Sequence, residues 1–284
     1  MNAGIYTMDA ATYHADPCDA PSLSSSIAKL LCTSSPAHVK DAHPRLNPEF
    51  VTDHAEHFDV GTVAHAVLLE GVNCVEVLPF ADWRTKAARE ARDAVRAKGK
   101  VPLQTWAWAH VEAMLNTTRD QLDAHADGRQ MFRGGLPEQT LIWQDDGGEW
   151  CRARLDWLRA GAIDDYKTTN ATANPEALSR TLFSNGWDIQ AAFYLRGLKK
   201  LTGEDAVFRF AVQETYPPYA LSVVALGPAA LMLAEKKVRY ALELWTHCLE
   251  HGDWPGYPTQ TAYAALPEYL EAAWLAKEER GLAV

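Results

Sequence analysis

Charged side chains stand at strand-like spacing in the segment AIDDYKT, residues 162–168. Side chains alternate between the two faces of a β-strand, so residues two apart share a face. This rule pairs Asp165 with Lys167 and turns Asp164, three residues from the lysine, to the opposite face. The segment therefore predicts a carboxylate and an ammonium group side by side on one face of a strand.

The preceding segments add two carboxylates. In EWCRARLDWL (149–158), Asp156 shares a face with two arginines, and a neighbouring antiparallel strand would bring it close to Asp165. Glu138 begins the strand before that and is expected to flank them. Carboxylate oxygens are the ligands that Mg²⁺ and Mn²⁺ prefer, and such an ion polarises a scissile phosphate and stabilises the leaving oxygen. Lys167 would orient or help to deprotonate the attacking water. The alternative is an exposed sheet face crossed by salt bridges.

Two predicted helices offer further polar side chains. His65 lies mid-helix in GTVAHAVLLE, where it is either a core residue or a neutral imidazole ligand that suits Mn²⁺ better than Mg²⁺. Gln190 and Tyr194 are four residues apart in WDIQAAFYLRGL and so occupy one helical face. They either border the core or reach the site with an amide and a phenol.

Hydrophobic spacing and turn residues predict the elements that must position these groups. Helices are expected at 57–71, 102–127, 187–201 and 228–250, and strands at 138–146, 149–158, 162–168 and across 207–226. This order predicts an α/β (α+β) fold with one central mixed β-sheet flanked by helices.

Composition excludes several classes of protein. The 284 residues are 48% hydrophobic and 23% charged, which argues against disordered and fibrous architectures. No apolar run approaches the roughly 20 residues that a membrane span needs, and the N-terminus has no signal-peptide layout. The five cysteines lie far apart without any CxxC, which argues against a zinc ribbon, an iron–sulfur cluster and a disulfide framework. We expect a soluble, cytoplasmic protein.

One basic stretch stands out in a chain whose net charge of −10 speaks against a non-specific nucleic-acid coat. Residues 84–100 carry seven basic residues against Glu90 and Asp93, a surplus of five. They form either an exposed helix face or a surface that binds backbone phosphates. The seven are Arg84, Lys86, Arg89, Arg92, Arg96, Lys98 and Lys100.

Taken in order, the motifs resemble a known family. They are G-x-x-x-H (Gly61 to His65), Glu138, Asp156, D-Y-K-T (Asp165 to Thr168) and Q-x-x-x-Y (Gln190 to Tyr194). The set is similar to the RecB-like branch of the PD-(D/E)XK nucleases, and within it to the RecE-type exonucleases, exodeoxyribonuclease VIII and its phage-borne relatives. The N-terminal YHADP and LSSSIAKLLCTSSPAHVK extend the likeness to roughly residues 5–260. Leu155 departs from the pattern, because the family usually has a proline there.

The resemblance implies more than the spacing does. It implies a PD-(D/E)XK fold and a 5′→3′ exonuclease on linear double-stranded DNA. The enzyme would leave 3′ single-stranded tails for a RecT-like annealing protein in phage or prophage recombination. It also implies a trimeric or tetrameric ring that encircles DNA ends in the cytoplasm of a bacterial host, with no membrane partner.

The resemblance further implies roles for single residues. Mg²⁺ or Mn²⁺, with two ions per active site and no iron–sulfur cluster, would be held by His65, Asp156, Asp165 and the backbone carbonyl of Tyr166. Glu138 would assist the second ion, Lys167 would act on the water, and Gln190 and Tyr194 would complete the pocket.

We expect a single exonuclease domain with an N-terminal helical cap (1–55), a nuclease core (56–260) and a C-terminal helical tail (261–284). Three other interpretations stay open at this point. They are a nuclease of other polarity or substrate (an endonuclease or a single-strand-specific enzyme), a catalytically inactive DNA-binding or scaffold protein, and a metal hydrolase for small molecules.

Overall fold

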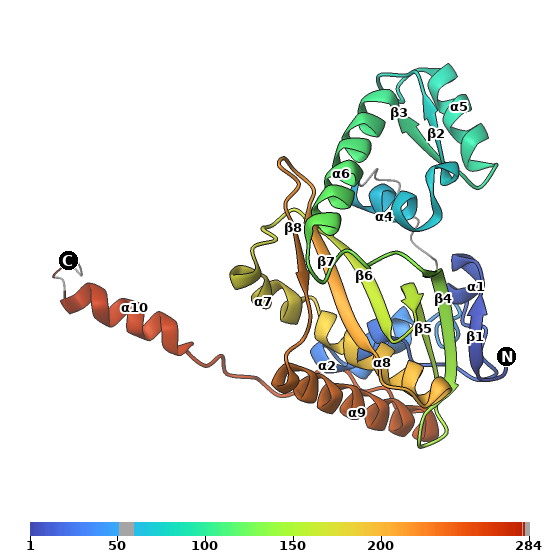
Figure 1. Ribbon diagram of the computed structural model, residues 1–284. Coiled ribbons are helices and arrows are strands. Elements are labelled where there is room, and N and C mark those ends of the chain that lie inside the picture. The colour runs from blue at the N-terminus through green and yellow to red at the C-terminus, as the bar shows by residue number, and fades with distance from the viewer. Residues whose placement is uncertain (51–59, 280, 282–284) are drawn as a thin grey trace.

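A six-stranded mixed β-sheet forms the centre of the molecule (Figure 1). The computed structural model describes residues 1–50, 60–279 and 281. In spatial order the strands are β1 (Gly4–Thr7), β4 (Gly135–Gln144), β5 (Trp150–Arg159), β6 (Ala162–Thr169), β7 (Val207–Glu214) and β8 (Leu221–Val224). Neighbours are antiparallel except β6 and β7, which are parallel. The predicted central mixed sheet flanked by helices is confirmed.

Helices cover both faces of this sheet, because its strands send apolar side chains to both. One layer consists of α2 (Ser25–Thr33), α8 (Trp187–Thr202) and α9 (Pro228–His251), which share a core with sheet residues such as Trp143 and Phe210. The other consists of α4 (Val60–Glu70) and α6 (Thr105–Ala124), which pack on Tyr166 and Ala211. The remaining helices around the sheet are α1 (Ala10–His14), α3 (Pro36–Ala42) and α7 (Pro175–Ser184).

A small unit lies beyond one end of the sheet (Figure 1). It contains the parallel strands β2 (Val75–Leu78) and β3 (Val101–Gln104), the single turn η1 (Val72–Cys74) and helix α5 (Lys86–Arg96). The prediction of a helix over residues 102–127 was wrong at both ends, because α6 spans Thr105–Ala124. The first residues of the predicted range pair with β2 as part of β3, and His125 ends α6 by accepting the backbone N–H groups of Asp127 and Gly128.

The other predicted elements agree with the structure to within a few residues. Strands β1, β2 and β3 and helix α7 were not predicted, and α10 lies within the helical tail expected at 261–284. Residues 57–59 of the first predicted helix lie outside the described residues, as does the boundary expected at 55/56. The N-terminal segment, expected as a helical cap, also supplies strand β1 to the sheet edge.

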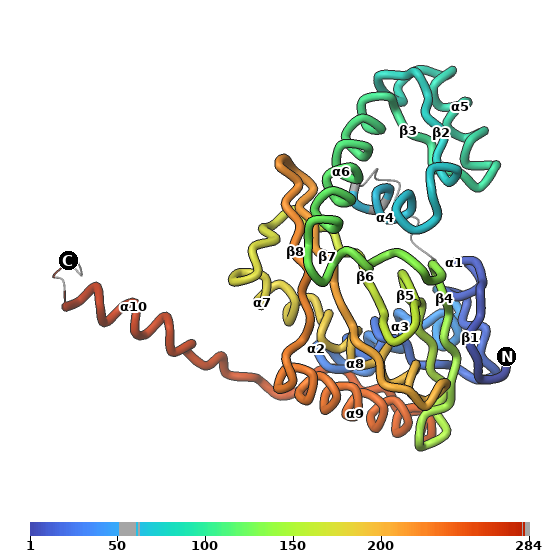
Figure 2. The backbone as a smooth tube through the Cα atoms, viewed as in Figure 1, coloured from blue at the N-terminus to red at the C-terminus, as the bar shows by residue number. Residues whose placement is uncertain are grey.

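The last helix that the structure describes, α10 (Glu268–Glu279), lies far from the N-terminus at the end of an extended segment (Figure 2). Of the helices that the structure describes, none has the length and apolar character needed to cross a bilayer.

Candidate active site

The carboxylate–ammonium pair predicted in β6 is present. Lys167 Nζ lies 2.7 Å from Asp165 Oδ1, and the Asp165 side chain is fully buried. Asp164 points to the opposite face, where Arg159 Nε donates to its Oδ2 at 2.7 Å. Strand alternation thus directs Asp165 toward the site, whereas Asp164 binds Arg159 near the turn of the β5–β6 hairpin.

Asp156 joins the pair because β5 and β6 stop pairing beside it. Backbone pairing of the two strands ends at Trp157 and Asp164. One step further in the same register Asp156 faces Asp165, and its Oδ2 accepts the Tyr166 N–H at 2.8 Å. The carboxylate replaces a strand carbonyl as the partner of that N–H. Since the N–H and C=O of one strand residue point to the same edge, the Tyr166 carbonyl faces the same gap.

His65 reaches the carboxylates from α4. Its Nε2 lies 3.0 Å from Asp156 Oδ2. Gly61, about one turn earlier, allows the helix to approach β6 closely, because a Cβ at this position would lie 2.2 Å from Thr168 Oγ1. The glycine of the G-x-x-x-H motif is therefore required by the helix–strand contact that brings the imidazole to Asp156.

Helix α8 supplies an amide and a phenol. Gln190 Nε2 donates to Asp165 Oδ2 at 2.7 Å, so that carboxylate is held by Lys167 at one oxygen and by Gln190 at the other. Tyr194 is buried in the core, where its ring centroid lies 6.0 Å from that of Phe208. Of the two side chains, Gln190 is the one that the structure connects to a carboxylate of the site.

Glu138 lies opposite Asp156 in a strained stretch of β4. Its neighbours on either side pair with the neighbours of Asp156 in β5. Its φ is +53°, a left-handed conformation that few residues other than glycine adopt and that often marks a functional site. Arg154 Nε donates to Glu138 Oε2, and Arg154 Nη1 donates to the Met8 carbonyl at 2.7 Å. The contact between Arg154 and Glu138 was not predicted from the sequence.

Burial and crowded charge shift the pKa values of the site in different directions. Burial, reinforced by Asp156, raises the pKa of Asp165 to about 7. Burial also acts to raise the pKa of Asp156, but the hydrogen bond and charge of His65 outweigh it and the pKa is lowered. Burial acts to lower the pKa of His65 and of Lys167, yet the neighbouring carboxylates raise both. Burial raises the pKa of Glu138. The raised pKa of Asp165 therefore reports carboxylates crowded together in a buried site, and a bound cation would favour their charged forms.

The donor types suit a hard divalent cation: two carboxylates, an imidazole and a backbone carbonyl. Both contacts of Asp156 use Oδ2, and Oδ1 takes part in neither. In the arrangement of the described residues, no three His, Cys, Asp or Glu side chains form a ready metal cluster. A cation shared by Asp156 and Asp165 would take over the charge compensation that Lys167 now provides at Asp165. The residues fit such an ion in type, and the ligand set named above stays a prediction.

The basic stretch 84–100 lies in the small unit, and its helix α5 turns Ala88 and Val95 inward. Its surplus charge is smaller than the sequence count suggested, because two acids from outside the stretch join it. Seven cations face four carboxylates, and the ion pairs are Arg84–Asp82, Lys86–Glu90, Arg92–Asp93 and Lys98–Glu76.

A protein-family model covers most of the chain and the whole of this site. The model describes a PDDEXK-like domain of unknown function, DUF3799, and matches residues 24–267. This chain belongs to the DUF3799 family. Membership in DUF3799 supports nuclease activity and agrees with the resemblance to PD-(D/E)XK nucleases. It does not distinguish the RecE-type exonucleases from other members of that superfamily.

The DUF3799 chain is also similar to a solved structure, described as that of a "Putative exonuclease" from Eubacterium rectale. The two share 11% sequence identity with a TM-score of 0.59, over 94% of this chain and 98% of the other. A likeness at this identity shows the fold. No curated protein matches the sequence significantly.

Proposed function

We propose that this protein is a metal-dependent exonuclease that degrades linear double-stranded DNA from 5′ to 3′ and leaves a 3′ single strand. The observation that carries the proposal is the convergence of Asp156, Asp165 and Lys167 at the gap between β5 and β6. The DUF3799 family supports the nuclease chemistry. The polarity, and the delivery of the 3′ strand to a RecT-like annealing protein in a bacterial cytoplasm, rest on the motif resemblance.

The residues divide the chemistry between them. Asp156, Asp165 and His65 would hold Mg²⁺ or Mn²⁺ together with the Tyr166 carbonyl, and Glu138 would serve a second ion. When bound, such ions neutralise charge on the scissile phosphate and on the leaving oxygen. Lys167, kept protonated by its carboxylate neighbours, orients the attacking water and offsets negative charge on the phosphate. Gln190 fixes the orientation of Asp165. Positioning and electrostatic stabilisation supply most of the rate enhancement.

The DNA backbone would be bound through the basic stretch 84–100. Phosphate contacts by Lys and Arg carry no base-sequence information, so they suit an enzyme that selects a duplex end. The small unit shares a hydrophobic core with α4, the helix that carries His65. DNA bound to the small unit would therefore lie next to the helix that contacts Asp156.

The test is digestion of linear duplexes labelled at one 5′ or one 3′ end, with 5′-phosphate or 5′-hydroxyl termini, in Mg²⁺, Mn²⁺ or EDTA. We expect metal-dependent loss of duplex with the 5′ label released first, and no action on a covalently closed circle. The Asp165→Ala protein, purified in the same way, controls for contaminating nucleases.

The other results separate the remaining interpretations. Nicking of the circle would identify an endonuclease, and release of the 3′ label first would reverse the polarity. Digestion confined to single strands would identify a single-strand-specific enzyme. Binding of DNA without turnover in either metal would identify an inactive scaffold.

A further inference from the structure

Helix α10 projects from the body of the molecule and packs on none of the described sheet or helices (Figure 1). None of its twelve residues is buried, and Leu270, Trp274 and Leu275 are 47%, 56% and 51% exposed. A helix this short is marginal in water unless an apolar face packs against something. The exposed apolar side chains of α10 are therefore available to pack against a surface outside its own chain.

The segment that leads to α10 is fixed to the body. The Trp254 ring packs edge-on against buried Trp245 with centroids 5.6 Å apart, and the Tyr257 ring lies 5.3 Å from that of His38. Anchoring at these points directs the rest of the segment outward, so the helix is presented away from its own chain (Figure 2).

Helix α10 carries apolar side chains on one face and is acidic as a whole. Leu270, Ala273 and Trp274 stand at spacings of three and four residues on that face, and Lys277 lies on it beside them. Four glutamates outnumber this lysine: Glu271 and Glu278 flank the face, and Glu268 and Glu279 lie on the opposite, acidic side together with Leu275. Its partner surface should therefore be apolar and bordered by positive charge.

The body offers such a surface in a groove between α2, α7, α8 and α9. Phe183, Ile189 and Tyr240 line it together with Lys236 and Lys237, and none of its described lining residues is acidic. Phe183 and Tyr240 are 40% and 54% exposed. Lys236 and Lys237 stand four and three residues before Tyr240 on α9, so a helix laid on this face meets both cationic and apolar side chains.

Two details extend the match. Leu233, which is 50% exposed, lies on the same face of α9: Lys237 follows it after four residues and Tyr240 follows Lys237 after three. Lys29 lies against Gly186 at the groove's edge and adds a further cation. Lys237 is the one groove lysine with a described carboxylate partner, Asp188 at 2.6 Å. The groove thus keeps a positive surplus.

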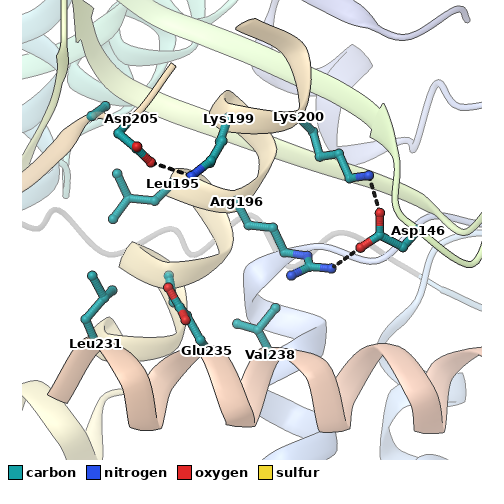
Figure 3. A pocket seen from close by; sticks show the side chains of 11 residues that line it. Asp146, Leu195, Arg196, Lys199, Lys200, Asp205, Leu231, Glu235 and Val238 are labelled. Carbon is teal, nitrogen blue, oxygen red and sulfur yellow. Dashed lines mark hydrogen bonds and ion pairs between the residues drawn. The ribbon is translucent and has the colours of Figure 1, made fainter. Parts of the chain in front are cut away.

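The cavity on the other side of α9 fits an acidic helix less well (Figure 3). Its cations on α8 are already paired, Lys199 with Asp205 and both Arg196 and Lys200 with Asp146. A glutamate of α9 also lines it. Carboxylates there would repel the glutamates of α10, so charge favours the first groove.

We propose that α10 of one chain docks in the groove between α2, α7, α8 and α9 of a second copy. The apolar face of α10 covers Phe183 and Tyr240, and its glutamates lie toward Lys236 and Lys29. Because helix and groove are different surfaces, the contact is heterologous, and successive contacts either close into a ring or extend as a filament. This interface does not depend on the nuclease chemistry proposed above.

The test measures the mass of the full chain by light scattering and sedimentation over a dilution series, for the wild type, Trp274→Glu and Tyr240→Glu. Both positions are more than half exposed, so the variants should fold, which circular dichroism checks. We expect a wild-type oligomer and monomeric variants, with association weakened by about 30-fold or more, as for a buried aromatic hot spot. Ala272→Glu, on the acidic side of α10, is the matched control and should associate normally.

Mixing the two variants identifies the occupant of the groove. Trp274→Glu keeps an intact groove and Tyr240→Glu an intact α10, so an equimolar mixture should form a dimer and nothing larger. A wild type that stays monomeric throughout would overturn the proposal. So would normal assembly of Tyr240→Glu, which would indicate that α10 pairs with itself, and so would a mixture that stays monomeric.

Discussion

Asp156 Oδ2 accepts the backbone N–H of Tyr166 at 2.8 Å, across the point where β5 and β6 cease to pair. The same oxygen lies 3.0 Å from His65 Nε2. One carboxylate therefore satisfies a backbone donor that lost its strand partner and connects α4 to the sheet. The opening between the strands is the place where Asp165 and Lys167 become available for chemistry.

Replacement of Asp165 by Ala should abolish cleavage and leave DNA binding intact, because a proposed ligand is lost while the basic stretch is untouched. Digestion of a linear duplex and a binding isotherm measure the two effects. The matched control is Asp164→Asn on the opposite strand face, which weakens the bond to Arg159 but should retain turnover per folded molecule. Normal turnover by Asp165→Ala would remove this site from the chemistry.

Replacement of Lys167 by Ala should lower turnover by about 10² or more, the scale of a group that assists proton transfer or stabilises charge. Single-turnover digestion with saturating enzyme measures this without a contribution from binding. A change below about threefold would place Lys167 outside the reaction.

Gly61→Ala should disturb the site from a distance, because the new Cβ meets Thr168 Oγ1 at 2.2 Å. We expect a loss of about 1–3 kcal/mol in the free energy of unfolding, as for other overpacked contacts, and reduced cleavage as α4 withdraws His65. Denaturant melts and digestion assays measure the two. The double variant with Thr168→Ala removes the nearest clashing atom and should recover part of both losses. Wild-type behaviour of Gly61→Ala would show that the close contact is not needed.

Replacement of Arg89, Arg92 and Arg96 together by Gln should weaken DNA binding and flatten its dependence on salt, since fewer counterions are released. Affinity measured at several salt concentrations gives the slope. The control is the same change of charge at Lys199, Lys200 and Arg239, on α8 and α9 away from α5 (Figure 1). If the two variants show the same dependence of DNA affinity on salt, α5 is a solvated helix face and does not bind DNA.

The buried His43 should make the protein less stable in mild acid. Burial lowers its pKa even though Asp16 Oδ2 lies 3.4 Å away and Ser22 offers its carbonyl, and Arg152 and Arg45 are the other charged groups around it. Below its ordinary pKa of about 6.5 the unfolded chain takes up a proton that the folded chain does not, so stability falls as the pH falls and is fully present above that value.

Denaturant melts at about pH 7.5 and about pH 5.5 measure this for the wild type and His43→Asn. The wild type should lose more stability between the two values than the variant does. An equal or smaller loss would show that His43 is not the group that titrates.

The local geometry of the site followed from the sequence alone. Backbone periodicity fixes which residues share a face, so the alternation in β6 sufficed to pair Asp165 with Lys167 and to exclude Asp164. The same reasoning set Gln190 and Tyr194 on one face of α8, from which Gln190 donates to Asp165 and Tyr194 packs in the core. The order of elements likewise predicted a central mixed sheet.

Only the tertiary structure decided what lies across long separations in the chain. The divergence of β5 from β6, the approach of His65 through Gly61, and the contact of Arg154 with Glu138 depend on how whole elements pack. Likewise the sequence could not show that acids outside residues 84–100 join its cations, or that α10 stands clear of the body. Spacing determines a side chain's direction within one element, because the backbone repeats, whereas its neighbours from other elements are set by packing that no local pattern records.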